Sequence, residues 1–138
     1  MPLVRYLALV LALAAPAAAA TWNPTAYANE STLELRTVGA QEGDHWFPVW
    51  LVVLDDQVYV RLGGRAAGRV EGSTTAPFLG VRVKGEEFPR VRGVPAPEQA
   101  GRVADAMGQK YWSDLLIRYF DHPLTLRLVP EPTPVAQQ

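Results

Sequence analysis

Trp46-Phe-Pro-Val-Trp-Leu-Val-Val-Leu54, Asp55-Asp56 and Gln57-Val-Tyr-Val-Arg-Leu62 follow one another in the chain and decide the fold. Both alternating sets of residues in the first run are apolar, so we expect a strand that is covered on both faces. The two aspartates tolerate left-handed backbone angles, and the run after them alternates valine or leucine with other residues. The stretch therefore predicts a hairpin in the core of the protein.

The segments around this hairpin predict further short strands. Alternation indicates strands over 33–38, 78–84, 87–94 and 124–129, and Pro89 should lie at an edge or a bulge because proline cannot donate to the ladder. Residues 63–72 contain four glycines, which favours a loop with one helical turn at most. Helices are predicted over 98–111 and 113–120. The sum is a mainly β fold: a six-stranded antiparallel barrel with one or two helices before the last strand.

Residues 1–20 have the order of a secretory signal. Arg5 precedes an apolar run from Tyr6 to Ala15, and Ala18 and Ala20 provide a small-residue cleavage site. We expect cleavage near Ala20 and a periplasmic or secreted mature protein. The domain plan is then a signal at 1–20, an N-terminal arm at 21–31, the barrel at 32–130 and a disordered Pro-rich tail at 131–138.

Composition excludes several kinds of site. The chain has no cysteine, which excludes disulfides, thiolate metal sites and thiol nucleophiles. Its only histidines, His45 and His122, lie far apart in the sequence and give no metal-ligand spacing, so no metal site is expected. With 13 Lys and Arg against 14 Asp and Glu, the chain has no basic excess. We therefore expect neither nucleic acid nor a membrane as a partner.

Six short motifs follow one another along the chain: Thr37-Val-Gly39, Pro48-Val-Trp50-Leu-Val-Val, Val58-Tyr-Val-Arg61, the Gly85 hairpin, Lys110-Tyr111 and Leu126-Arg-Leu-Val-Pro130. Their order resembles that of the flavin-binding split-barrel group, which includes pyridoxamine-phosphate-oxidase-like proteins and deazaflavin-dependent nitroreductases. The resemblance covers residues 32–130 and implies a split β-barrel that forms a homodimer. It also implies FMN or deazaflavin as cofactor in a groove at the subunit interface.

One segment departs from that group. Its members follow the Thr-x-Gly motif with a basic residue and a Ser-Gly pair that meet the cofactor phosphate, whereas this chain has Ala40-Gln-Glu-Gly-Asp44. The two carboxylates would repel a phosphate. A basic pocket built from another direction could compensate, and Trp46 is a candidate ring contact. The candidate cofactor-binding residues are therefore Arg36, Arg61, Arg65, Arg69 and Trp46.

Two functions remain open at this point. The first is an exported split-barrel protein that binds a flavin-like or other small planar, anionic ligand, as an oxidoreductase whose chemistry belongs to the cofactor. The second is a non-enzymatic periplasmic ligand-binding or structural module that kept the fold without the cofactor. No residue spacing predicts a catalytic group for either function.

Overall fold

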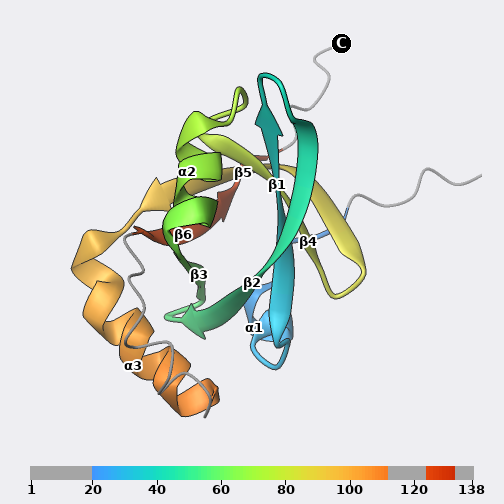
Figure 1. The fold of residues 1–138 in the computed structure, drawn as a ribbon. Helices are drawn as coiled ribbons and strands as arrows, with labels where there is room; N and C mark the ends of the chain where they lie inside the picture. The colour runs from blue at the N-terminus through green and yellow to red at the C-terminus, as the bar shows by residue number, and fades with distance from the viewer. Residues whose placement is uncertain (1–19, 112–123, 133–138) are drawn as a thin grey trace, which may run out of the picture.

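Six antiparallel strands close into a barrel in the order β1-β2-β3-β6-β5-β4 (Figure 1). The structure is a computed structural model that describes residues 20–111 and 124–132. The strands are β1 (Thr32–Gly39), β2 (Gly43–Leu54), β3 (Gln57–Leu62), β4 (Phe78–Val83), β5 (Glu86–Pro95) and β6 (Leu124–Pro130). The helices are α1 (Pro24–Tyr27), α2 (Gly64–Gly72) and α3 (Ala100–Lys110), the last preceded by a 3₁₀ turn at Pro97–Gln99. The predicted six-stranded barrel is confirmed.

The central hairpin forms as the sequence predicts. Strands β2 and β3 pair with Leu54 opposite Gln57, and the two turn residues between them, Asp55 and Asp56, have φ angles of 52° and 60°. Two successive left-handed residues are typical of the tight turn whose twist matches that of the flanking strands. The carboxylates thus occupy positions that most other side chains avoid.

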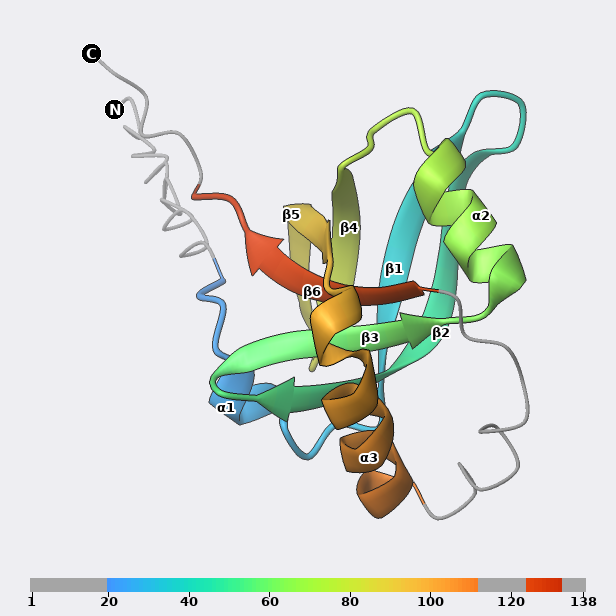
Figure 2. The same ribbon diagram turned by 90° about the vertical axis from the view of Figure 1, so that its left-hand side faces the viewer.

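Strand β2 is covered on both faces over its second half. Leu51 is fully buried among the apolar side chains that fill the barrel. Val52, its neighbour, is buried on the outer face beneath α3, in a separate cluster with Val103 and Met107. Figure 2 shows α3 lying in front of β2 and β3. The two alternating apolar sets of β2 therefore pack in two separate hydrophobic clusters, one inside the barrel and one beneath α3.

Polar contacts, most of them partly buried, fasten the end of α3 to β2 and to the segment before β1. The ammonium of Lys110 donates to the carbonyl oxygens of Glu30 and Leu51, at 2.5 and 3.0 Å. The hydroxyl of Tyr111 lies 2.6 Å from the carbonyl oxygen of Ser31 and 2.8 Å from that of Leu51. The ring of Tyr111 also stacks on Trp50, with 4.9 Å between centroids. Burial lowers the pKa of Lys110 and raises that of Tyr111.

Two segments are more regular than predicted. Residues 63–72, expected to be a loop with at most one helical turn, form the nine-residue helix α2. The expectation was wrong because Gly64, Gly68 and Gly72 all fall on the exposed side, while Ala66, Ala67 and Val70 pack against the barrel core. The N-terminal arm likewise contains the short helix α1, which buries Tyr27 against Trp22 and Phe88.

The second hairpin differs from its prediction by one residue. The left-handed turn positions are Lys84 and Gly85, with φ of 52° and 75°, so β5 begins at Glu86. Pro89 lies where the β4–β5 register shifts between Leu79 and Val81, which confirms the predicted bulge.

The first residue after β6 is still bound to the barrel, because the backbone N–H of Glu131 donates to the carbonyl oxygen of Arg90. The predicted signal, the helix over 113–120 and the rest of the tail lie outside the described residues.

Replacing Leu51 by alanine tests the barrel core. Leu51 has no exposed surface, so we expect Leu51→Ala to lower the free energy of unfolding by about 2–5 kcal/mol, the range for truncating a buried leucine. Urea denaturation followed by tryptophan fluorescence measures the change. Leu54→Ala, at the half-buried end of the same strand, is the control and should cost less. Equal, small losses in both variants would contradict the assignment of Leu51 to the core.

Candidate functional site

Helix α2 is held against one end of the barrel by its apolar side and by its C-terminal connection. Ser73 is buried, and its Oγ accepts a hydrogen bond from the backbone N–H of Val38 at 3.0 Å. The N–H of Thr74 in turn donates to the carbonyl of Val38 at 2.8 Å. These two bonds fix the end of the helix beside the last residues of β1. The exposed side of α2 therefore has a defined position relative to the β1–β2 turn.

A pocket of about 430 Å³ lies between α2 and the β1–β2 turn. The strand end contributes Thr37 and Gly39, the turn contributes Glu42, and the helix contributes two arginines and two glycines. The lining residues are Thr37, Gly39, Glu42, Arg65, Gly68, Arg69 and Gly72. A side chain at Gly68 or Gly72 would meet no atom within 4 Å, so the absence of side chains there leaves open space.

Glu42 is neutralised within this pocket by Arg69. The Nη2 atom of Arg69 donates to Oε1 of Glu42 at 3.1 Å, and this hydrogen bond is the main reason why the pKa of Glu42 lies below its usual value. His45 Nδ1 lies 3.5 Å from the same oxygen. The carboxylate that the sequence places where a phosphate would approach is therefore already paired, and its repulsion of an anion is reduced.

Two polar groups of the pocket residues lack hydrogen-bond partners. Thr37 is only 1% exposed, and neither its hydroxyl nor the buried Nε of Arg69 has a partner in the described part of the chain. Buried polar groups are nearly always satisfied by protein, water or a ligand. Arg65 is exposed at the rim and forms no ion pair with any side chain of residues 20–111 or 124–132. The pocket thus offers one uncompensated positive charge and two unused polar groups, which suits a small anion.

The five predicted site residues occupy three different places. Arg65 and Arg69 line the pocket together. Arg36 and Trp46 face outward on β1 and β2, where Arg36 lies over the Trp46 ring at 5.7 Å and 3.7 Å from Asp44. Arg61 follows Tyr59 on the outer side of β3, because Val58, Val60 and Leu62 point into the barrel. The structure therefore does not join all four arginines into one basic pocket.

Sequence reasoning missed two contributors to the pocket. Thr37 occupies the inward register after Leu33 and Leu35, so a polar residue at the end of an apolar series could have marked it. The glycines at 68 and 72 lie one helical turn apart, but this spacing has meaning only once a helix is expected there. The sequence predicts that Glu42 repels a phosphate, because nothing in it indicates the pairing with Arg69 that the structure shows.

The pocket fits the anionic part of a cofactor and not its ring. Arg65, Arg69 and the Thr37 hydroxyl suit a phosphate or carboxylate, whereas none of the described lining residues is aromatic. In residues 20–111 and 124–132 no three acidic or histidine side chains gather closely enough to hold a metal ion. Within those same ranges, no helix has the length and apolar character needed to cross a membrane.

Comparison with solved structures identifies the architecture. The heme storage protein HutZ from Vibrio cholerae superposes with a TM-score of 0.57 at 19% identity, over 79% of this chain and 88% of HutZ. The chain has the split-barrel fold. The conserved hypothetical protein Rv2991 from Mycobacterium tuberculosis gives 0.56 at 17% identity over 78% of each chain. A protein described as a domain-swapped dimer gives 0.54 at 13% identity, over 72% of this chain and 80% of that one.

Comparisons of sequence give no match. No known protein-family profile matches the chain, and no curated protein sequence matches it significantly. Because the solved structures are less than 25% identical, they establish the fold and leave the ligand to be argued from the pocket.

Two glycine substitutions test how the pocket and the barrel are built. Gly68→Ala should raise the free energy of unfolding by about 0.5–1 kcal/mol, because alanine favours the helix and nothing lies within 4 Å of the new methyl group. Gly80→Ala should lower it by about 1–3 kcal/mol, because its Cβ would lie 2.9 Å from that of Arg36. Thermal or urea unfolding measures both. A loss of stability in Gly68→Ala would show that the space beside α2 is already filled.

Proposed function

We propose that this protein is a split-barrel protein that binds a small planar ligand through an anionic group seated in the α2 pocket. The observation that carries the proposal is the buried Thr37 hydroxyl, which has no partner among residues 20–111 and 124–132 and belongs to a residue that lines the pocket with Arg65 and Arg69. An anion there would accept from the hydroxyl and from a guanidinium. Such charge-assisted hydrogen bonds are about twice as strong as neutral ones.

Two planar, anionic ligands are the first candidates. FMN carries a phosphate and is the cofactor expected from the resemblance to flavin-binding split barrels. Haem carries two carboxylates, and the structural neighbour HutZ is a heme storage protein. Either ring would extend beyond the pocket, because its described lining has no aromatic side chain. Deazaflavin cofactors belong to the same class.

A homodimer is part of the proposal. The domain-swapped dimer among the structural neighbours supports an assembly of two copies. We assign no catalytic role to the described lining residues, and any oxidoreductase activity would come from the bound cofactor. Without a redox cofactor, the same pocket would make the protein a non-enzymatic binding module. We also propose export to the periplasm or beyond, on the sequence of residues 1–20.

Titration of the protein with FMN and, separately, with hemin tests the pocket. We expect saturable binding of one of them, and we expect Arg65→Glu to weaken it by about tenfold or more, since one charged hydrogen bond contributes about 1.5–3 kcal/mol. Arg102→Glu is the matched control, because Arg102 is an exposed arginine on α3 that pairs with Asp55. If Arg65→Glu and Arg102→Glu bind that ligand with equal affinity and keep the melting temperature of the wild type, Arg65 does not contact the ligand.

Glu42→Gln should have the opposite effect. The substitution removes a negative charge from the pocket and releases Arg69 from its 3.1 Å pair, so the affinity for an anionic ligand should rise. Isothermal titration calorimetry with the same ligand measures the gain, and Glu98→Gln, an exposed glutamate at the 3₁₀ turn, serves as the control. Weaker binding by Glu42→Gln would show that Glu42 contacts the ligand directly.

A further inference from the structure

A second surface of the barrel carries arginines stacked on aromatic rings. It is the outer face of the four neighbouring strands β5, β4, β1 and β2, and we call it the arginine face. Its residues are Arg36, Arg82, Arg90, Arg92, Trp46 and Phe78. Strand β1 lies in the middle, where Arg36 is opposite Trp46 on one side and opposite Gly80 on the other. Thr37, the neighbour of Arg36, points the other way, so the arginine face is distinct from the α2 pocket.

The rings and guanidinium groups of this face are in direct contact. Arg82 lies over the Trp46 ring at 4.1 Å from its centroid, and Arg36 approaches the same ring at 5.7 Å. Phe78 is covered by Arg90 at 3.6 Å and by Arg92 at 4.8 Å. Between the two rings, Gly80 has no side chain to keep Arg36 away from β4. Stacking and ion pairing hold the arginines in defined positions, which lowers the entropy cost of binding a partner.

The charges of the face are balanced. Arg82 pairs with Glu34 at 2.9 Å and with Glu87 at 3.5 Å. Arg36 pairs with Asp44, and Arg92 pairs with Glu131 at 2.9 Å. Three of the four arginines therefore pair with four carboxylates, and with Arg90 the charges of these eight side chains sum to zero, so they give no net charge to attract a polyanion. A surface that carries both signs in alternation can instead meet a copy of itself across a two-fold axis, where each arginine can approach a carboxylate of the partner.

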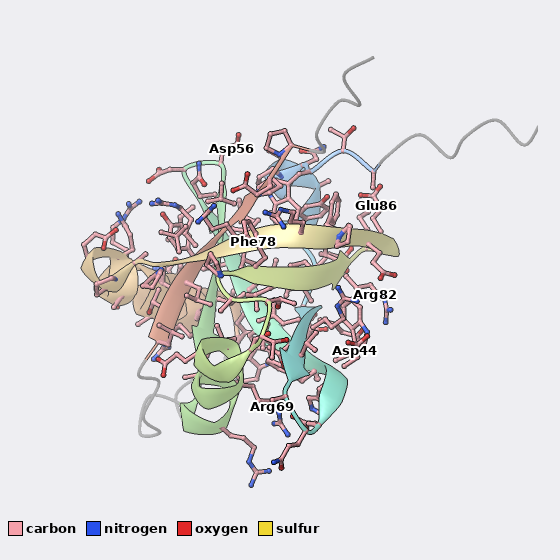
Figure 3. The ribbon with its side chains drawn as sticks, turned by 90° about the horizontal axis from the view of Figure 1, so that it is seen from above. Asp44, Asp56, Arg69, Phe78, Arg82 and Glu86 are labelled. Atoms are coloured by element: carbon pink, nitrogen blue, oxygen red, sulfur yellow. The ribbon has the colours of Figure 1, made fainter. Side chains whose placement is uncertain are left out.

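The face is also accessible. The side chains of Arg82 and Arg92 remain 44% and 43% exposed despite their ion pairs. In Figure 1 the helices α2 and α3 lie on the left of the barrel and β4 lies on the right. Figure 3 shows Arg82 and Asp44 together on one side of the molecule, with Arg69 apart from them near α2. Tryptophan, phenylalanine and arginine are the residues enriched at the centres of protein interfaces.

We propose that the arginine face is the surface through which two copies of this chain form a homodimer. The proposal rests on the homodimer included in the proposed function and adds the place where the subunits meet. It assigns Arg36 and Trp46, two of the predicted ligand contacts, to subunit association. Arg82 over Trp46 would form its centre, flanked by the Phe78 cluster.

Sedimentation velocity of the wild type and three variants tests this surface. We expect a dimeric wild type, and we expect Arg82→Glu and Arg90→Glu each to raise the dimer dissociation constant by about tenfold or more, as for interface hot spots. Arg102→Glu on α3 should leave the dimer intact. A monomeric wild type, or dimers in both face variants as stable as in Arg102→Glu, would overturn the proposal. Arg90→Glu keeps the test valid if Arg82→Glu unfolds, because Arg90 forms no ion pair with any described side chain.

Titration with inorganic phosphate separates this proposal from the pocket. A monomeric Arg82→Glu variant that still binds phosphate would support the arginine face as the dimer contact while leaving the α2 pocket in place. A wild-type dimer that binds neither phosphate nor FMN nor hemin would contradict the proposed anion binding by the α2 pocket. It would not contradict the arginine face as the dimer contact.

Discussion

The two-sided burial of β2 is the constraint on which the rest of the structure depends. The side chain of Leu51 fills the barrel, while its backbone carbonyl accepts hydrogen bonds from the end of α3. Its neighbour Val52 is buried beneath that helix. Shifting this strand by one residue would exchange the two apolar sets and leave both cores without their partners. The register of β2 thereby fixes the hairpin to β3, the pairing with β1 and the positions of the α2 pocket and the arginine face.

Alternate residues of strand β1 point to opposite faces, so this strand contributes side chains to two different surfaces. Its inward series ends at Thr37, at the barrel end covered by α2; this residue lines the same pocket as Arg65 and Arg69, and its hydroxyl has no partner among the described residues. Its outward series carries Glu34 and Arg36 into a balanced layer of charges and rings. Adjacent residues of one strand thus contribute to the proposed anion site and to the proposed dimer interface. The pocket keeps net positive charge because Glu42 pairs with Arg69 and leaves Arg65 without an acidic partner in the described residues, whereas three of the four arginines of the outer layer pair with carboxylates.

The fold was predictable because its signals are local. Alternation located the strands, and the turn residues Asp55 and Asp56 located the central hairpin. Helix α2 was not predictable from propensity, which penalises Gly64, Gly68 and Gly72 equally wherever they point. Its stability comes from Ala67 and Val70 against the core, a tertiary contact that the sequence does not display.

The candidate site was predictable only in part, because it too depends on contacts between residues that are distant in the sequence. Two of the four arginines, Arg65 and Arg69, are one helical turn apart and could be grouped once the helix is known. The pairing of Glu42 with Arg69 joins residues that are distant in sequence. It reduces the repulsion that Glu42 in the β1–β2 turn is expected to exert on a phosphate. The outward direction of Arg36 follows from the register of β1, which depends on the closed barrel.

The comparison of FMN with riboflavin tests the central claim most directly. The two molecules share the same ring system and differ by the phosphate, so the ratio of their dissociation constants isolates the anionic group that the α2 pocket is proposed to hold. Fluorescence titration of the purified mature protein measures both constants under identical salt conditions. The account predicts that FMN binds at least about tenfold more tightly than riboflavin, as the loss of a charged hydrogen bond would produce. Measurable binding of both flavins with equal affinity would show that the pocket beside α2 does not seat a phosphate.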